Sequence, residues 1–196
     1  MLIMVSAIGV LNYTITGFAS ATQSTNTNVT IAAAISIALS TNLSKGIEFG
    51  TITLLPANQT NATANYANTT GGGGPGDLNI TLYNVTLSSD STENADFCVR
   101  ANGDMCTSAC SSRIGIANIT WAANTTNNLT HPPTGVFRAL FGRSMATGFD
   151  KGDINLAPGG VTHYRFWLNV SGAQAAGDYN NTVDFRAVST GDACGS

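Results

Sequence analysis

Apolar and polar residues alternate along much of this chain, and this period of two predicts β-strands rather than helices. The alternation is clearest in residues 28–40, 161–171 and 180–188. The positions predicted to face the core in these strands are Val29, Ile31, Ala33, Ile35, Ile37, Leu39, Tyr164, Phe166, Leu168, Val170, Val183, Phe185 and Ala187. The outer face of residues 161–171 would then carry His163, Arg165, Trp167 and Asn169.

Two further segments alternate but exchange their faces midway. A β-bulge, which inserts one extra residue into a strand, explains such an exchange. It is predicted near Leu82 and Tyr83 in residues 78–87, and again within residues 113–123. Residues 58–76, 124–135 and 157–160 are rich in Gly, Pro, Asn and Thr, so they are predicted to be loops or turns.

Several strands joined by such turns predict an all-β fold, an antiparallel β-sandwich of the jelly-roll kind. A chain of 196 residues is long enough for one such domain. We expect the sandwich to span residues 25–196 and to be preceded by an N-terminal strand and spacer in residues 1–24.

The composition limits the chemistry that this domain can perform. Only 10% of the residues are charged, the net charge is -3, and 8 Lys plus Arg offer no basic surface for nucleic acid. The two histidines, His131 and His163, lie far apart in sequence, and no nucleophile elbow, HExxH motif or paired carboxylates are present. The sequence therefore predicts a protein that is not an enzyme.

Many of the asparagines lie in Asn-X-Ser/Thr sequons, the acceptor sites for N-glycosylation. Asn-X-Ser/Thr sequons outnumber chance expectation about threefold and follow the polar faces of the predicted strands, which indicates dense N-glycosylation and an extracellular protein. The candidate glycosylation sites are Asn12, Asn28, Asn42, Asn58, Asn61, Asn68, Asn79, Asn84, Asn118, Asn124, Asn128, Asn169 and Asn180.

The four cysteines, Cys98, Cys106, Cys110 and Cys194, suggest two disulfides in an extracellular chain. Asn102-Gly103 is a hairpin signal that would bring Cys98 opposite Cys106 and leave Cys110 to pair with Cys194, although three connectivities are possible. A zinc site formed by Cys98, Cys106, Cys110 and His131 is the less favoured alternative, because the spacing matches no common zinc finger.

Calcium is the other metal for which the sequence offers candidate ligands. The carboxylates in segments 90–96 and 150–153 could supply oxygen ligands, but these segments fit no EF-hand loop and are more typical of solvated loops. The prediction is therefore a protein without a metal or other cofactor, apart from covalently attached glycans. The acidic residues in question are Asp90, Glu93, Asp96, Asp150 and Asp153.

The apolar N-terminal segment, residues 1–21, admits three interpretations. A signal peptide is suggested by Ala19-Ser20-Ala21, but the first basic residue of the chain is Lys45. A membrane helix is disfavoured by the Gly and Thr content and the interruption at Asn12. A β-strand fits best, with Leu11, Tyr13 and Ile15 on one face. Such a strand could fold back into its own sandwich, or it could complete the sheet of a neighbouring copy and generate an open filament.

These features together resemble a known family. The N-terminal strand, the sequence "ISIALSTNLSKGIEFGTI" and residues 156–185 are similar to fibre proteins of the TasA/camelysin type, and more so to the archaeal bundling pili and thread filaments. The resemblance implies a jelly-roll subunit whose strand around Leu11, Tyr13 and Ile15 inserts into the next subunit. The cysteines and the many sequons favour the archaeal side of this comparison.

The leading hypothesis is thus a structural subunit of an extracellular adhesive or biofilm filament, whose partners are further copies of itself, arranged head to tail. Neighbouring filaments and cell surfaces would be further contacts, with no nucleic acid and no membrane span. The alternative is a monomeric or lattice-forming cell-surface module that binds carbohydrate or an S-layer, and a secreted hydrolase comes third.

Overall fold

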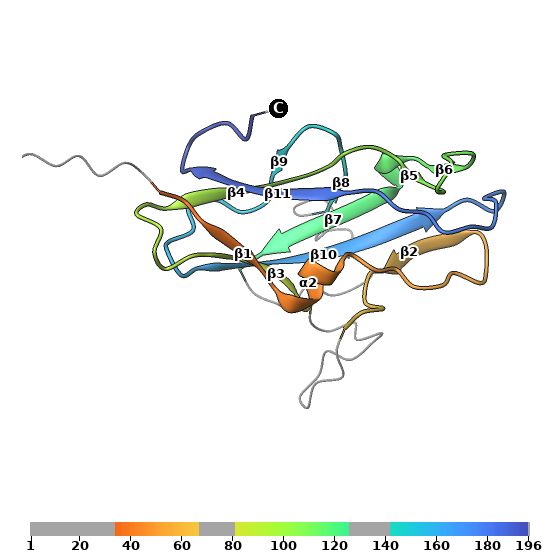
Figure 1. Ribbon diagram of the computed structural model, residues 1–196, viewed down its shortest axis with the longest axis horizontal. Helices are drawn as coiled ribbons and strands as arrows, with labels where there is room; N and C mark the ends of the chain where they lie inside the picture. Colours follow the sequence, from red (N-terminus) through yellow and green to blue (C-terminus); the bar gives the residue numbers. More distant parts are fainter. Residues whose placement is uncertain (1–33, 67–80, 126–141, 196) are drawn as a thin grey trace, which may run out of the picture. The chain divides into compact units, whose positions relative to one another are not determined.

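A computed structural model describes residues 34–66, 81–125 and 142–195, which all belong to one compact unit, Ala33–Ser196 (Figure 1). The predicted strand around Leu11, Tyr13 and Ile15 lies outside the described residues. The division of the chain into residues 1–24 and 25–196 therefore stays a prediction. Within the described residues the structure confirms the predicted all-β, antiparallel sandwich.

The larger sheet is built around one long central strand, β10 (Val161–Val170). On one side β10 pairs with β7 (Ile119–Asn124), which is followed by the edge strand β8 (Arg143–Ser144). On the other side it pairs with β3 (Tyr83–Leu87) and with β2 (Ala57–Asn61), and β3 pairs in turn with β1 (Ile37–Leu39). Every pairing is antiparallel.

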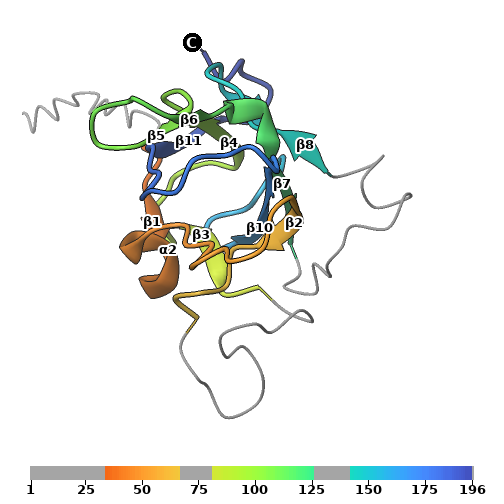
Figure 2. The ribbon, with the colours of Figure 1, turned by 90° about the vertical axis from the view of Figure 1, so that its right-hand side faces the viewer.

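The smaller sheet has the order β11 (Val183–Ser189), β4 (Ala95–Ala101) and β9 (Asp150–Lys151). A separate hairpin pairs β5 (Met105–Cys106) with β6 (Arg113–Ile114). Figure 2 shows β4 and β11 in one layer and β3, β10 and β2 in the other. The core between the layers is aromatic, and Phe185 of β11 packs edge-on against Tyr164 of β10, with ring centroids 5.1 Å apart.

The core-facing positions of two strands are predicted correctly. Tyr164 and Phe166 of β10 have no exposed surface, and Val183 and Phe185 of β11 pack partly buried against the same core. The outer-face positions are predicted less well: Arg165 and Trp167, which were expected to lie on the polar outer face of β10, are also fully buried. The chain after β2 accounts for part of this, because it runs beside β10 and its Tyr66 hydrogen-bonds to the Arg165 guanidinium.

Of the strand predicted over residues 28–40, residues 34–40 are described, and within them the strand β1 spans Ile37–Leu39. It ends at Leu39 because Ser40 caps a short helix, α2 (Thr41–Lys45), by accepting a hydrogen bond from the Leu43 N–H at 3.3 Å. The helix ends at Gly46, whose φ of 128° is easily reached only by glycine. Leu39, predicted to face the core, is 42% exposed.

Two other local predictions are wrong in instructive ways. Residues 58–61, predicted to begin a loop, belong to strand β2, because the unpaired edge of β10 accepts their backbone despite the polar sequence. The change of face in residues 113–123 comes from a 3-10 turn, η1 (Ile116–Asn118), rather than a bulge. Of residues 78–87 the structure describes only residues 81–87, in which β3 begins at Tyr83. Residues 78–80, on the far side of the predicted bulge, lie outside the described residues, so the bulge is not tested.

The predicted disulfide pairing is also wrong. Cys98 bonds to Cys194, and Cys106 and Cys110 are both free thiols. The chain does turn after β4, but β5 then leaves the sheet to pair with β6, so Cys106 never comes opposite Cys98. The bond holds the C-terminal segment on the outer face of β4, where Arg186 also donates to the Cys194 carbonyl at 2.8 Å. Because Cys98 is in a disulfide, the zinc site with His131 is excluded as well.

Asp96 ties three segments together on the same outer face. Its buried carboxylate accepts hydrogen bonds from Lys151 Nζ at 2.5 Å and from the backbone N–H groups of Asn155 and Gly191. Burial alone would raise the pKa of Asp96, but these donors outweigh burial and lower the pKa below its usual value. The charged carboxylate therefore stabilises the folded chain.

We expect Asp96→Asn to lower the free energy of unfolding at pH 7 by about 2 kcal/mol, since Lys151 and two backbone N–H groups lose their charged acceptor. Because the folded pKa is lowered, this stabilisation is present above an aspartate's ordinary pKa and lost as the pH falls through the folded pKa. Urea titrations should therefore show a smaller loss of stability below about pH 4 in the variant than in the wild type.

The matched control is Asp184→Asn, which removes an exposed ion pair with Arg100 (3.0 Å) on the neighbouring strand. It should cost less than about 1 kcal/mol. Equal costs for the two variants would contradict the importance assigned to Asp96.

Candidate functional site: an apolar groove

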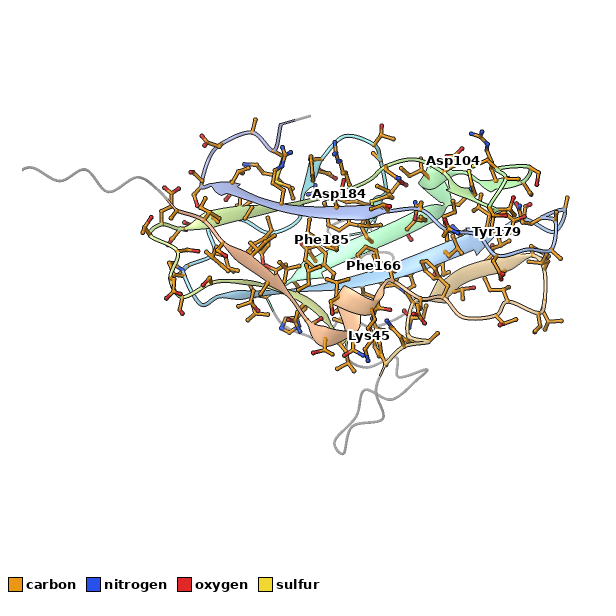
Figure 3. All side chains as sticks on the ribbon, in the orientation of Figure 1. Lys45, Asp104, Phe166, Tyr179, Asp184 and Phe185 are labelled. Atoms are coloured by element: carbon orange, nitrogen blue, oxygen red, sulfur yellow. A yellow bond between two sulfur atoms is a disulfide. The ribbon has the colours of Figure 1, made fainter. Side chains whose placement is uncertain are left out.

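An apolar groove of about 890 Å³ opens between the two sheets. It lies beside β11 on one side and beside the chain that links α2 to β2 on the other. Figure 3 shows Phe185 of β11 opposite Phe166 of β10, and Tyr179 farther along the loop that enters β11. The groove therefore opens directly onto the aromatic core.

Aliphatic and aromatic side chains form most of the groove's lining, and they come from both sheets, the β5–β6 hairpin and helix α2. They are Leu39, Leu43, Ile47, Phe49, Ile52, Leu55, Met105, Ile114, Ile119, Leu168, Val170, Tyr179, Val183 and Phe185. Leu39 and Leu55 are each 42% exposed, which is unusual for leucine next to a core. An exposed apolar surface of this kind typically marks a binding site.

Both long sides of the groove present backbone groups without partners among the described residues. On one side, β11 is the edge strand of its sheet and pairs only with β4. On the other, residues 49–55 run without strand pairing and make no backbone hydrogen bond within the described part of the chain. Unpaired edges of this kind accept an additional β-strand through main-chain hydrogen bonds.

The groove carries little charge. Among its lining residues only Glu48 and Asp178 are charged, and both are exposed at its rim. A charged ligand would thus lose its hydration inside the groove without gaining a charged partner. The chemistry of the lining therefore favours an uncharged, apolar occupant.

One end of the groove is held in shape by a polar cluster. The Tyr179 hydroxyl and the Gln174 side chain both donate to Ser112 Oγ, at 2.7 Å and 3.0 Å. Cys106 and Asn180 also exchange two backbone hydrogen bonds of 2.9 Å. These bonds join residues 174–180 to the β5–β6 hairpin, so that the two form a single wall.

Sequence reasoning did not find this groove. Its lining comes from segments spread between Leu39 and Phe185, and no local pattern reports that such segments meet. Residues 35–52 and 156–185, the stretches from which the sequence predicts a resemblance to filament subunits, supply most of the walls. The counterpart predicted from the sequence, Leu11, Tyr13 and Ile15, lies outside the described residues.

The described sequon asparagines differ in how accessible they are. Asn58, Asn118 and Asn180 are exposed, whereas Asn42, Asn84, Asn124 and Asn169 are half-buried. Asn84 and Asn124 flank His163 across the outer face of β10. Asn61 lies on that face beside Trp167, and both of its side-chain amide atoms are buried. The other candidates, Asn12, Asn28, Asn68, Asn79 and Asn128, lie outside the described residues.

We expect glycans on Asn58, Asn118 and Asn180 and none on Asn61, because a glycan is attached to the amide nitrogen and that of Asn61 is buried. Intact-glycopeptide mass spectrometry of protein from its native source checks this occupancy. A glycan on Asn61 together with bare Asn118 and Asn180 would contradict it.

Three of the acidic residues weighed as calcium ligands have other partners. Asp96 bonds to Lys151, Asp150 accepts from Arg143 at 2.6 Å, and Asp153 accepts from the Thr162 hydroxyl at 3.1 Å. Within the described residues no three or more His, Cys, Asp or Glu side chains gather as a metal site would require. In the same part of the chain, no helix is both long enough and apolar enough to cross a membrane.

No protein-family model, no curated protein and no solved structure matches this chain. The function is therefore inferred from the groove and from the sequence.

Proposed function

We propose that this chain is the structural subunit of an extracellular, glycosylated filament used for adhesion or biofilm formation. Each subunit accepts the N-terminal strand of a neighbour in its groove, as the resemblance to thread filaments and bundling pili implies. The observation that carries the proposal is an apolar groove whose two long sides both offer backbone groups for an added strand.

The N-terminal segment has the chemistry that the groove favours. Residues 1–44 contain no charged side chain, and residues 11–15 alternate Leu, Tyr and Ile with Asn and Thr. A strand of that pattern would place Leu11, Tyr13 and Ile15 against the core and its polar residues toward water. Head-to-tail contacts of this kind do not close on themselves, so they generate a filament.

The test is a pair of charged variants of the strand in the full chain. Leu11→Asp/Ile15→Asp would place two carboxylates in the groove, whereas the control, Thr16→Asp/Ser20→Asp, adds the same charge at even-numbered, polar positions and leaves the Asn12 sequon intact. We expect negative-stain microscopy to show filaments for the control and only single subunits for the first variant, as for a deletion of residues 1–20. Filaments that survive the deletion would overturn the proposal.

A further inference from the structure

The two free cysteines share one small loop beside the groove. Thr107 N–H donates to the Ser112 carbonyl at 3.2 Å, and Cys110 N–H donates to the Thr107 carbonyl at 2.7 Å. This turn follows directly after Cys106, places Cys106 and Cys110 on the same small loop beside one hollow, and holds Cys110 at a φ of 46°. A positive φ in a residue other than glycine is uncommon and often marks a functional position.

Both thiols are accessible to a reagent. Cys106 and Cys110 line a hollow of about 400 Å³ that Asn102 and Asn181 also border, and Cys110 is exposed. The other cysteines are bonded to each other, and Cys98 is fully buried. An oxidant in solution would therefore meet Cys110 first and Cys106 next.

We propose that Cys106 and Cys110 form a second, exposed and reversible disulfide that braces the wall of the groove. A small disulfide or an oxidoreductase disulfide is the oxidant. The Cys110 thiolate attacks one of its sulfurs and releases the first thiol. The Cys106 thiolate then attacks Cys110 Sγ and releases the second, so two protons and two electrons leave the dithiol and reduce the oxidant.

The position of the loop explains why such a bond would matter. Ser112, at the end of the loop, holds Tyr179 and Gln174, and Met105 and Ile114 of the same hairpin face the groove. Closing the loop covalently would restrict this wall and favour the shape that a strand requires. Formation of the bond is independent of the proposed function, and only its effect on assembly rests on that function.

Trypsin provides a direct test, because Arg100 and Arg113 enclose both cysteines in the single peptide 101–113. The full chain is incubated with oxidised glutathione, alkylated, denatured and digested. We expect a peptide lighter than the dithiol by two hydrogen atoms and unmodified by the alkylating reagent until it is reduced. Alkylated dithiols, or a peptide cross-linked to Cys98 or Cys194, would overturn the inference.

Hydrogen exchange tests the bracing itself. In oxidised wild type, the amides of residues 105–114 and 174–180 should exchange about tenfold more slowly than in Cys106→Ser/Cys110→Ser, and mild reduction should remove the difference. Equal rates would contradict a bracing role. If the bond forms but no form of the chain makes filaments, the proposed function fails and the disulfide stands. If filaments form while both thiols stay free, the disulfide fails and the proposed function stands.

Discussion

Leu39→Asp/Leu55→Asp is expected to abolish filament formation and to leave the subunit folded. Both leucines line the groove and are 42% exposed, so the new carboxylates remain hydrated in the free subunit. Once a strand occupies the groove, each carboxylate would be desolvated against apolar side chains, at a cost of several kcal/mol. Negative-stain microscopy and circular dichroism measure assembly and folding separately.

The chain offers a closely matched control. Leu54 and Ile154 are 81% and 64% exposed, and neither lines the groove, although Leu54 is the immediate neighbour of Leu55. Leu54→Asp/Ile154→Asp therefore adds the same charge to the same protein and should assemble normally. If both double variants lose filaments, net charge rather than the groove is responsible.

A mixing experiment separates a donated strand from one that folds back into its own subunit. The groove variant Leu39→Asp/Leu55→Asp keeps an intact N-terminal strand, whereas the chain that lacks residues 1–20 keeps an intact groove. Mixed together, the two should form a dimer that grows no further, because neither of its ends can bind another subunit. If the strand packed within its own chain, no dimer would form and the groove variant would unfold.

The alternation of residue types was sufficient to predict the sheets' central strands but not their surroundings. Tyr164 and Phe166 are buried as predicted because an inward position in a central strand meets the opposite sheet wherever that sheet comes from. Arg165 and Trp167 are buried too, and this depends on segments that return over the outer face, such as the one that carries Tyr66. Local periodicity holds no information about those segments.

The same limit explains why the sequence predicted neither the groove nor the correct disulfide pairing. Leu39 is exposed and the edge of β11 is free because no further strand lies beside them in the described fold. A periodic sequence predicts only that a strand has an inner face, and it does not predict which strands lie beside it. The Asn102-Gly103 signal predicted a turn, and a turn is present. It did not predict that β5 would pair with β6 instead of β4, because the pairing is decided by contacts distant in sequence.

Removing the Cys98–Cys194 bond should have the largest effect on the stability of the single subunit. The two cysteines are 96 residues apart, and closing a loop of that length is worth about 5 kcal/mol through the entropy of the unfolded chain. We therefore expect Cys98→Ser/Cys194→Ser to lower the free energy of unfolding by about that amount, and Tm by about 10 °C. Guanidinium titrations under non-reducing conditions, on the Leu39→Asp/Leu55→Asp background that keeps the protein monomeric, measure it.

The control is Cys106→Ser/Cys110→Ser, which also removes two cysteines, but from a much shorter loop. Its loop-closure entropy limits the cost to about 2 kcal/mol even when the second bond is fully formed. The C-terminal segment adds a further contrast, because Cys98→Ser/Cys194→Ser frees it from β4 and weakens the bond from Arg186 to the Cys194 carbonyl. Proteolysis after Arg186 should thus accelerate in that variant alone, and equal cleavage in both variants would contradict the role assigned to this disulfide.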